Sequence, residues 1–258
     1  MGVSDQYTKE MRQRFGYSAT WVPTAEVRLG DVGILRNYQY ERARSLKDFG
    51  IKFKTRNDPG TGTLDYASAN SVAFAVNAGG NAPTEISDPA GLGGRIAVSF
   101  SKENAVFFQA ADCGSASIED QHALAELIIN LYEAGDWSED YVVITEVIHA
   151  KRATVLISSG SQATIEFAVN GNVKLSDFTL VAANAGLQVA RATNIGTQIV
   201  AACGLTPLFK AKAIKKRLLR SPTFDRRGGR TQSAATGQTS RTGAGSVFLG
   251  DVDYDNYA

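Results

Sequence analysis

Residues 140–150 constrain the fold most, because they form an almost continuous apolar run, Asp-Tyr-Val-Val-Ile-Thr-Glu-Val-Ile-His-Ala. A run of β-branched residues that is apolar on both faces predicts a central strand of a sheet. Glu146 lies inside this run, where a carboxylate must find hydrogen bonds or a charged partner, or give up its charge. The sequence therefore predicts a buried strand in which Glu146 has a partner, either as a satisfied core group or as part of a functional site.

The flanking residues predict a helix before this strand and further strands after it. Residues 120–134 place their apolar side chains on one helical stripe, and Gly135 is suited to end the helix. After the strand, residues 153–158 and 163–170 are separated by Ser159-Gly160-Ser161, and the second segment alternates apolar and polar residues. We expect two strands around a Ser-Gly-Ser turn.

The rest of the chain up to residue 219 predicts a single domain. A short helix is expected over residues 4–15, followed by strands near residues 20–22 and 32–35. Alternating or continuous apolar segments predict further strands, at residues 72–76, 96–100, 105–110, 180–192, 195–203 and 208–214. The expected class is α+β, with a twisted, largely antiparallel sheet, a few packed helices and a flexible C-terminal tail.

The composition changes after residue 219. Residues 228–245 are rich in Gly, Ser, Thr, Gln and Ala, which predicts a flexible linker over residues 220–245. Residues 246–258 combine acidic residues with apolar ones, and a merely solvating tail needs no such side chains. We therefore expect a C-terminal docking segment that acts through Phe248, Leu249, Val252, Tyr254 and Tyr257.

Charge and cysteine content exclude several classes of protein. The formal net charge of +1 argues against a nucleic-acid partner, because such domains carry a marked basic excess. Two distant cysteines, Cys113 and Cys203, indicate neither a disulfide framework nor a zinc site. No targeting segment or apolar run of about 20 residues is visible, so a cytoplasmic protein is expected.

The sequence carries no recognisable catalytic pattern. It contains two histidines, His122 and His149, and Cys113 could pair with either as nucleophile and base. No phosphate-binding loop, nucleophile elbow or zinc-binding helix motif accompanies them. We therefore expect no enzyme, no cofactor and no metal.

One motif suggests a family. Residues 141–147, Tyr-Val-Val-Ile-Thr-Glu-Val, resemble the Tyr-Val-Val-Thr-Glu-Val strand of gasdermin pore-forming domains, with one inserted residue. Residues 16–48 resemble bacterial members in a Pro-then-Leu-Gly pattern. The chain departs from bacterial gasdermins, which resemble one another in an N-terminal lipid-modified cysteine, because no cysteine precedes Cys113.

The resemblance implies an autoinhibited pore-forming protein. A protease would remove the C-terminal segment, and the released domain would form a homo-oligomer in a lipid bilayer and cause cell death, as in bacterial defence. The protein would be cytoplasmic when inactive and membrane-bound when active. Its partners would be the bilayer and the activating protease.

Three groups of residues are the candidate sites of this function. The alternating strands predict a membrane-inserting face made of Val155, Ile157, Ile165, Phe167 and Val169. A basic run predicts contacts with lipid headgroups through Lys210, Lys212, Lys215, Lys216, Arg217 and Arg220. The exposed linker offers cleavage points at Arg227, Arg230 and Arg241.

A second hypothesis explains the same absence of catalytic motifs. The chain would be a non-enzymatic, β-rich assembly module whose C-terminal arm docks on a neighbouring subunit. Leakage from liposomes after limited proteolysis separates the two hypotheses, because an assembly module produces none.

Overall fold

The structure is a computed structural model that describes residues 2–36, 38–77, 85–86, 94–169, 173–174, 187–217 and 246–252. Within these ranges, antiparallel strands dominate and two α-helices accompany them, which confirms the predicted α+β class. The helices are α1 (Val3–Phe15), the short 3₁₀ helix η1 (Leu46–Phe49) and α2 (Gln121–Ala134). The strands are β1 (Ser18–Ala19), β2 (Asp31–Arg36), β3 (Gln39–Ser45), β4 (Thr55–Ala67), β5 (Val72–Asn77), β6 (Glu85–Ile86), β7 (Gly94–Phe100), β8 (Val106–Ile118), β9 (Tyr141–Ser158), β10 (Ala163–Val169), β11 (Val173–Lys174), β12 (Leu187–Thr193), β13 (Ile195–Arg217) and β14 (Ser246–Asp251).

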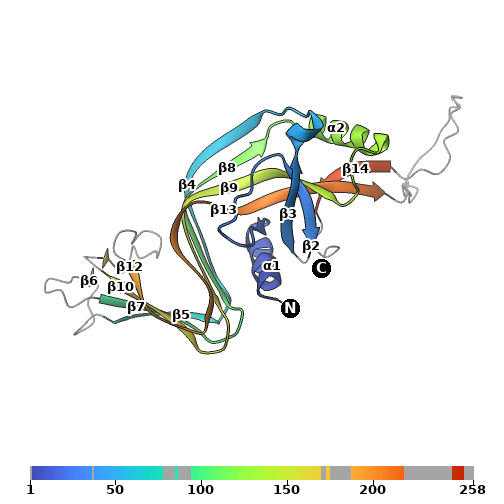
Figure 1. Ribbon diagram of the computed structural model, residues 1–258. Coiled ribbons are helices and arrows are strands. Elements are labelled where there is room, and N and C mark those ends of the chain that lie inside the picture. Colours follow the sequence, from blue (N-terminus) through green and yellow to red (C-terminus); the bar gives the residue numbers. More distant parts are fainter. Residues whose placement is uncertain are drawn as a thin grey trace, which may run out of the picture.

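The predicted apolar strand lies at the centre of the main sheet. This strand, β9, pairs with β13 along nearly its whole length. On its other side it pairs first with β2 and then with β8, and β4 pairs with the far edge of β8 (Figure 1). Both faces of this part of β9 are covered, because Val142 and Ile144 lie in one apolar cluster and Val143 lies in another. All three are fully buried, as expected for an apolar run of this kind.

A second, smaller sheet continues the main one. Its strand order is β12-β10-β7-β5, and we call it the distal sheet. Along the chain, β4 leads into β5, β7 into β8, β9 into β10 and β12 into β13. The four long strands of the main sheet, β4, β8, β9 and β13, therefore continue into the distal sheet in the same order. They form two antiparallel arms, one made of β4, β5, β7 and β8 and the other of β9, β10, β12 and β13 (Figure 1).

The two sheets meet at a sharp bend, and each of the four strands crosses it at a residue with a positive φ angle. These residues are Asn70, Asn104, Gln162 and Asn194, with φ between 53° and 61°. Asparagine adopts this left-handed conformation more readily than most residues. Ser158 Oγ accepts the Ala105 N–H at 2.9 Å and donates to the Lys102 carbonyl at 2.6 Å, which fixes two of the crossing strands together.

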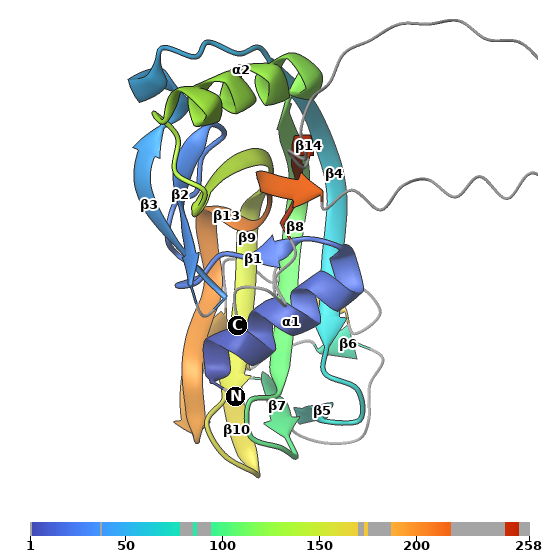
Figure 2. The ribbon, with the colours of Figure 1, turned by 90° about the vertical axis from the view of Figure 1, so that its right-hand side faces the viewer.

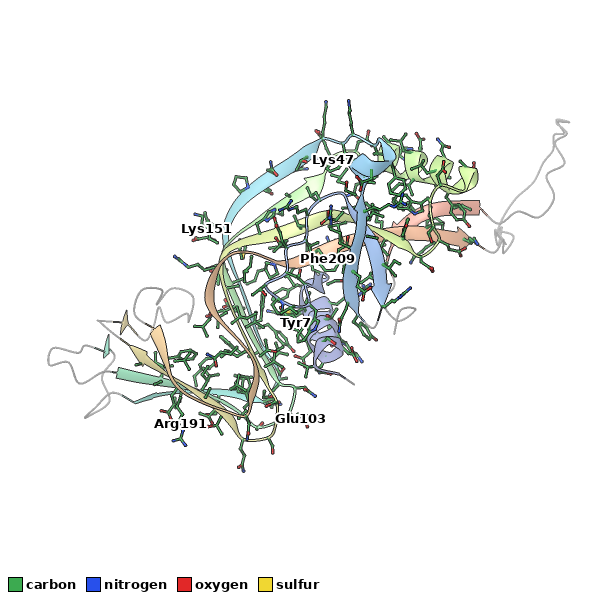
Figure 3. All side chains as sticks on the ribbon, viewed as in Figure 1. Tyr7, Lys47, Glu103, Lys151, Arg191 and Phe209 are labelled. Atoms are coloured by element: carbon green, nitrogen blue, oxygen red, sulfur yellow. The ribbon has the colours of Figure 1, made fainter. Side chains whose placement is uncertain are left out.

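Helix α1 lies across one face of the main sheet (Figure 2). Tyr7 and Met11 are fully buried against it, in a cluster that includes Phe108 and Val155, and Figure 3 shows Tyr7 between the helix and the strands. The helix ends at Gly16, whose φ of 73° is typical of a glycine C-cap. At the other end of the sheet, α2 buries Leu124 and Ile128.

The distal sheet packs in the angle of the bend, on the face of β8 and β9 opposite α1. Its fully buried side chains belong to the same cluster as Phe107 and Leu156. Val98, Phe100, Ala163, Ile165 and Phe167 make up the distal part of this cluster. At the start of β8, Val106 and Phe108 therefore face one core and Phe107 faces the other.

The pairing differs from the sequence-based prediction in three places. The segments on either side of Ser159-Gly160-Ser161 do not form a hairpin, because β9 pairs with β8 and β13 while β10 pairs with β7 and β12. The two strands predicted at residues 195–203 and 208–214 are one continuous strand, β13. A strand was expected at residues 20–22, but the strand in this region is the two-residue β1, which lies just before that range and ends at Ala19.

Candidate functional site

The C-terminal segment docks on the edge of the main sheet. Strand β14 pairs antiparallel with β13, from Lys212 opposite Asp251 to Arg217 opposite Ser246 (Figures 1 and 2). Val247 and Leu249 pack against the apolar cluster that contains Ile214 and residues of α2. Val252, which follows β14, is 2% exposed. Part of the predicted docking segment therefore contributes to the core of the domain.

Polar contacts also connect this segment to the body. Arg12 Nη2 of α1 donates to the Val252 carbonyl oxygen at 2.9 Å, and the Val252 N–H donates to the Ala211 carbonyl at 3.1 Å. The ion pair between Lys212 and Asp251 is long, at 3.6 Å, and the Asp251 side chain is 80% exposed, so it contributes little to stability. The C-terminal segment is thus attached both to β13 and to α1.

Glu146 has the specific partners that its place in a buried strand requires. Its carboxylate accepts a hydrogen bond from the Tyr17 hydroxyl and lies 3.1 Å from Lys210 Nζ on the neighbouring strand. The Lys210 ammonium also lies 4.2 Å from the centre of the Tyr17 ring. Residues from β9, β13 and the segment after α1 therefore form one charged cluster, which we call the Glu146 cluster.

The pKa values of the Glu146 cluster reflect this coupling. Burial, reinforced by the hydrogen bond and charge of Glu146, raises the pKa of the Tyr17 hydroxyl. Burial acts to lower the pKa of Lys210, but its hydrogen bond to Glu146 and the charge of that carboxylate outweigh burial, and the pKa is raised. Both groups therefore hold their protons more tightly in the folded chain.

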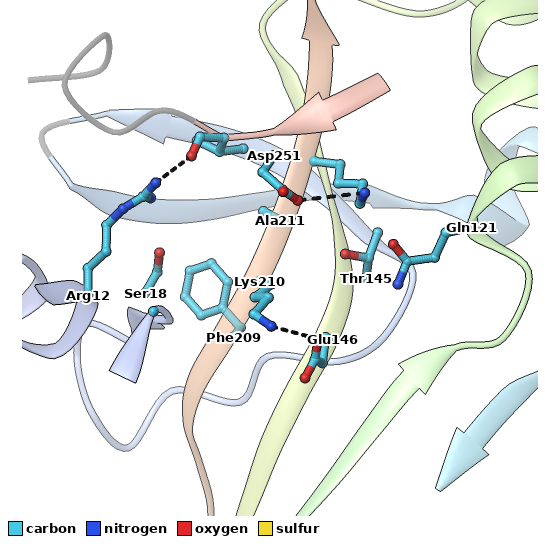
Figure 4. A pocket seen from close by; sticks show the side chains of 12 residues that line it. Arg12, Ser18, Gln121, Thr145, Glu146, Phe209, Lys210, Ala211 and Asp251 are labelled. Carbon is cyan, nitrogen blue, oxygen red and sulfur yellow. Dashed lines mark hydrogen bonds and ion pairs between the residues drawn. The ribbon is translucent and has the colours of Figure 1, made fainter. Parts of the chain in front are cut away.

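A polar pocket of about 360 Å³ lies beside the Glu146 cluster, between α1, β9, β13 and β14 (Figure 4). Ser18 and Thr145, which are almost fully buried, lie on its walls. Its lining residues are Arg12, Gly16, Ser18, Gln121, Thr145, Glu146, Phe209, Lys210, Ala211, Lys212, Asp251 and Val252.

The predicted lipid-binding residues do not form one unpaired basic surface. Lys210 and Lys212 line the pocket beside Glu146 and Asp251. Lys216 lies 2.7 Å from Glu139, while Lys215 pairs with Phe248 in the β13–β14 ladder. The structure does not describe the side chain of Arg217, and Arg220 lies outside the described residues.

The predicted membrane-inserting residues lie in two separate cores. Val155 and Ile157 pack beneath α1, whereas Ile165 and Phe167 pack in the bend. All four are fully buried, so none faces solvent in this arrangement. The side chain of Val169 is outside the described set.

Several other predicted residues cannot be placed. The linker arginines Arg227, Arg230 and Arg241 lie outside the described residues, as do Tyr254 and Tyr257. Phe248 and Leu249 are both half-buried in β14.

The described residues contain no arrangement that suggests catalysis. Cys113 pairs with Ala150 across β8 and β9, so the neighbouring His149 points to the opposite face of the sheet. Burial raises the pKa of the Cys113 thiol to about 11, which keeps it protonated near neutral pH. Within the described ranges, no group of three or more His, Cys, Asp or Glu residues could hold a metal ion, and no helix there is long and apolar enough to span a membrane.

Sequence reasoning missed Tyr17, Ser18 and Arg12 as parts of the site. The cost of burying Glu146 indicated that a partner exists, but not which residue it is. Tyr17 is 129 residues away in the chain, and no local pattern marks it.

Comparisons with known proteins give a similarity in structure and none in sequence. No protein-family model matches the sequence, and no curated protein matches it. Among solved structures, the chain is similar to the cryo-EM structure of the gasdermin A3 membrane pore, with 10% sequence identity and a TM-score of 0.31. The match covers 90% of this chain and 99% of that chain. These values are too low to assign a family or a function.

Proposed function

We propose that this chain is a gasdermin-like pore-forming protein that its own C-terminal strand keeps inactive. The observation that carries the proposal is the docking of β14 on β13, the strand that leads directly from the distal sheet into the main sheet. An occupied edge cannot pair with another chain, whereas an open edge is a template for pairing. Proteolysis in residues 220–245 would free β14 and expose this edge.

The form of the arms supports membrane insertion. A strand that crosses a bilayer needs about 9–11 residues, with apolar and polar side chains alternating. In β7 and β10, fully buried apolar residues alternate with partly exposed small or polar ones such as Ser99 and Glu166. Further chain lies between β5 and β7 and between β10 and β12 in the sequence, including the paired strands β6 and β11, so each arm has enough residues to cross a bilayer.

Open sheet edges support a homo-oligomer. Within the described residues, β5 and β12 are the edge strands of the distal sheet, and β4 has a partner on one side only. Among the described strands, residues 195–205 of β13 pair with β9 alone. The open edge formed by β4 and β5 in one copy can therefore pair with the open edge formed by β12 and β13 in the next copy. Repeated around a ring, this pairing lets each copy contribute four strands in the bilayer.

The assembly-module hypothesis uses the same C-terminal segment differently. It requires the segment to dock on a neighbouring subunit, whereas here β14 docks on its own chain. Intramolecular docking is what autoinhibition requires, and controlled cleavage separates the two hypotheses. At rest we expect a cytoplasmic protein, and after cleavage a membrane-bound one.

Dye release from liposomes after controlled cleavage tests the proposal. A specific protease site placed within residues 228–245 would allow the intact chain to be cut while both fragments remain present. We expect the cut protein to release dye and the uncut protein to remain inert. An absence of leakage after complete cleavage, with both bilayer binding and oligomerisation also absent, would favour the assembly module.

A matched pair of variants identifies the lipid-facing side. Phe74 is 51% exposed and lies on the apolar face of the distal sheet beside Phe107, so Phe74→Lys should leave the fold intact. A lysine that faces lipid near the bilayer centre costs about 2–4 kcal/mol, and leakage should fall strongly. Ala75→Lys, on the opposite face of the same strand, should retain leakage. Equal leakage from both variants would contradict the assignment of the Phe74 face as the side that contacts lipid.

A further inference from the structure

A groove runs beside the first half of α2. It lies between this helix and the extended residues 51–54, and its volume is about 530 Å³. Ile51, Phe53 and Leu124 contribute apolar side chains to it, and Leu127 on its wall remains 45% exposed. A groove with an apolar floor and charged rims is suited to an amphipathic segment of chain.

The surface around this groove is strongly acidic. Residues 103–150 contain no lysine or arginine. Seven of their acidic residues lie on α2 or in its flanking residues, and all seven are exposed: Glu119, Asp120, Glu126, Glu133, Asp136, Glu139 and Asp140. Lys52 and Lys54, on the opposite wall of the groove, balance only two of these charges. The surface therefore attracts a basic segment.

A segment of this chain has the matching chemistry. Residues 218–230, which lie outside the described residues, read Leu-Leu-Arg-Ser-Pro-Thr-Phe-Asp-Arg-Arg-Gly-Gly-Arg, and we call them the basic segment. Four arginines against one aspartate give it a net charge of +3, and three large apolar residues accompany them. A linker that serves only as a flexible tether needs neither feature.

The basic segment begins beside the acidic surface. It follows Arg217, the last residue of β13, and the preceding Lys216 already lies 2.7 Å from Glu139 and near the ring of Tyr132 in α2. Helix α2 has 14 residues and is therefore about 21 Å long. Ten extended residues reach about 33 Å. The basic segment is thus long enough to follow α2 from this contact to the groove at the other end of the helix.

We propose that the basic segment docks on α2 in the resting chain, with its apolar residues in the groove and its arginines on the surrounding carboxylates. Guanidinium groups form strong hydrogen bonds with carboxylates, and covering Leu127 adds an apolar contribution. The docking itself does not depend on pore formation. Its consequence rests on the proposed function: docked arginines are poorly accessible to a protease, whereas Arg241 lies beyond the basic segment. The cleavage that frees β14 therefore occurs first at Arg241.

Limited digestion of the full-length chain with trypsin tests the docking. Mass spectrometry follows cleavage after Arg227 and after Arg241, so each molecule carries its own reference site. A synthetic peptide of residues 218–245 gives the intrinsic rates at both sites. Relative to this peptide, we expect cleavage after Arg227 to be about tenfold slower in the chain, and cleavage after Arg241 to be unchanged. High salt should reduce the protection, because it screens the charges.

Variants of α2 show whether this surface provides the protection. Leu127→Gln, and separately Glu119→Lys with Glu126→Lys, change exposed side chains and should bring cleavage after Arg227 close to that of the peptide. Glu103→Lys makes the same kind of charge change far from α2 (Figure 3) and should leave the protection intact. Equal cleavage of the wild-type chain and the peptide, or equal protection in all variants, would overturn the proposal.

Dilution identifies the copy that supplies the segment. Protection within one chain does not depend on protein concentration, whereas protection that is lost on dilution would mean docking on a second copy and would overturn the proposal. Dye release is measured separately. A chain that shows protection but no leakage after cleavage retains this docking and contradicts the proposed function, and leakage without protection does the reverse.

Discussion

Glu146 illustrates how one carboxylate in an apolar strand dictates its surroundings. Its side chain is 20% exposed, so losing its partners would leave a charge in a mostly buried place. Tyr17 and Lys210 supply the partners from two distant segments. The Glu146 cluster thereby joins the end of α1 to the centre of the main sheet.

Removal of the lysine should destabilise the fold measurably. Lys210→Met leaves Glu146 with the tyrosine hydroxyl alone, and because the lysine is 40% exposed we expect a loss of only about 1 kcal/mol. The double variant with Glu146→Gln should cost less than the sum of the two single changes. Urea denaturation of the four proteins measures this, and strict additivity would mean that the two side chains do not interact.

The Glu146 cluster also predicts a dependence on alkaline pH. The pKa values of Tyr17 and Lys210 are raised in the folded chain above their ordinary values of 10.0 and 10.5. The folded state then binds protons more tightly, so this stabilisation is complete below about pH 10 and is lost as pH rises through the folded pKa values. The urea midpoint should fall between pH 10 and 11 more in wild type than in a Tyr17→Phe, Lys210→Met double variant. Parallel curves would contradict this.

The buried strand and the need for a partner of Glu146 could be predicted from the sequence, because both follow from local pattern and burial cost. The identity of the partner could not, since it depends on which distant segments the sheet brings together. Ser18 and Thr145 gave no signal for the same reason.

Each long strand is divided by the bend between the main sheet and the distal sheet. Local sequence does not distinguish such a bend from the turn of a hairpin. Alternation correctly predicted apolar strands around Val72, Ile96 and Ile165, but a short polar segment such as Ser159-Gly160-Ser161 suits a hairpin and a bend equally well. Only strand pairing separates the two, and pairing is set by long-range contacts. The helices were predicted closely, because their caps and apolar stripes are local.

The bend should be sensitive to residues that resist the left-handed conformation. Asn70 and Asn194 have exposed side chains and positive φ angles, so valine there changes backbone preference and not packing. We expect each Asn→Val change to cost about 1–2 kcal/mol, and each Asn→Gly change to be nearly neutral. Chemical denaturation measures both, with Lys151→Val in an ordinary strand position as the control. Equal effects of valine at all three positions would exclude strain at the bend.

The whole molecule is an extended sheet whose edges are covered unequally. The C-terminal strand protects residues 212–217 of β13, while residues 195–205 have no strand partner on that side within the described structure. A docking segment over residues 246–258 was a prediction from their apolar content. The pairing of β14 with β13 could not be predicted, because an edge strand pairs mainly through its backbone, which carries no sequence pattern.

Removal of the C-terminal segment should change the association state. A chain that lacks residues 246–258 exposes the β13 edge and the apolar residues beneath Val247 and Leu249, so it should self-associate as its concentration rises. Analytical ultracentrifugation would detect this. A synthetic peptide of residues 246–258 should restore the monomer, but only at high concentration, because it lacks the tether. A truncated chain that stays monomeric at all concentrations would contradict a protective role.

All four strands cross the bend between the two sheets, each with one residue there in the left-handed conformation. The length of the distal sheet can therefore vary independently of the main sheet. Inserting two residues into each of β5, β7, β10 and β12 would lengthen the sheet by about 7 Å and keep every side chain on its face. Inserting one would turn the apolar face outward in every strand. Proteins built on this plan could therefore match membranes or partners of different thickness by insertions in even numbers, without any change in the docking of the C-terminal strand.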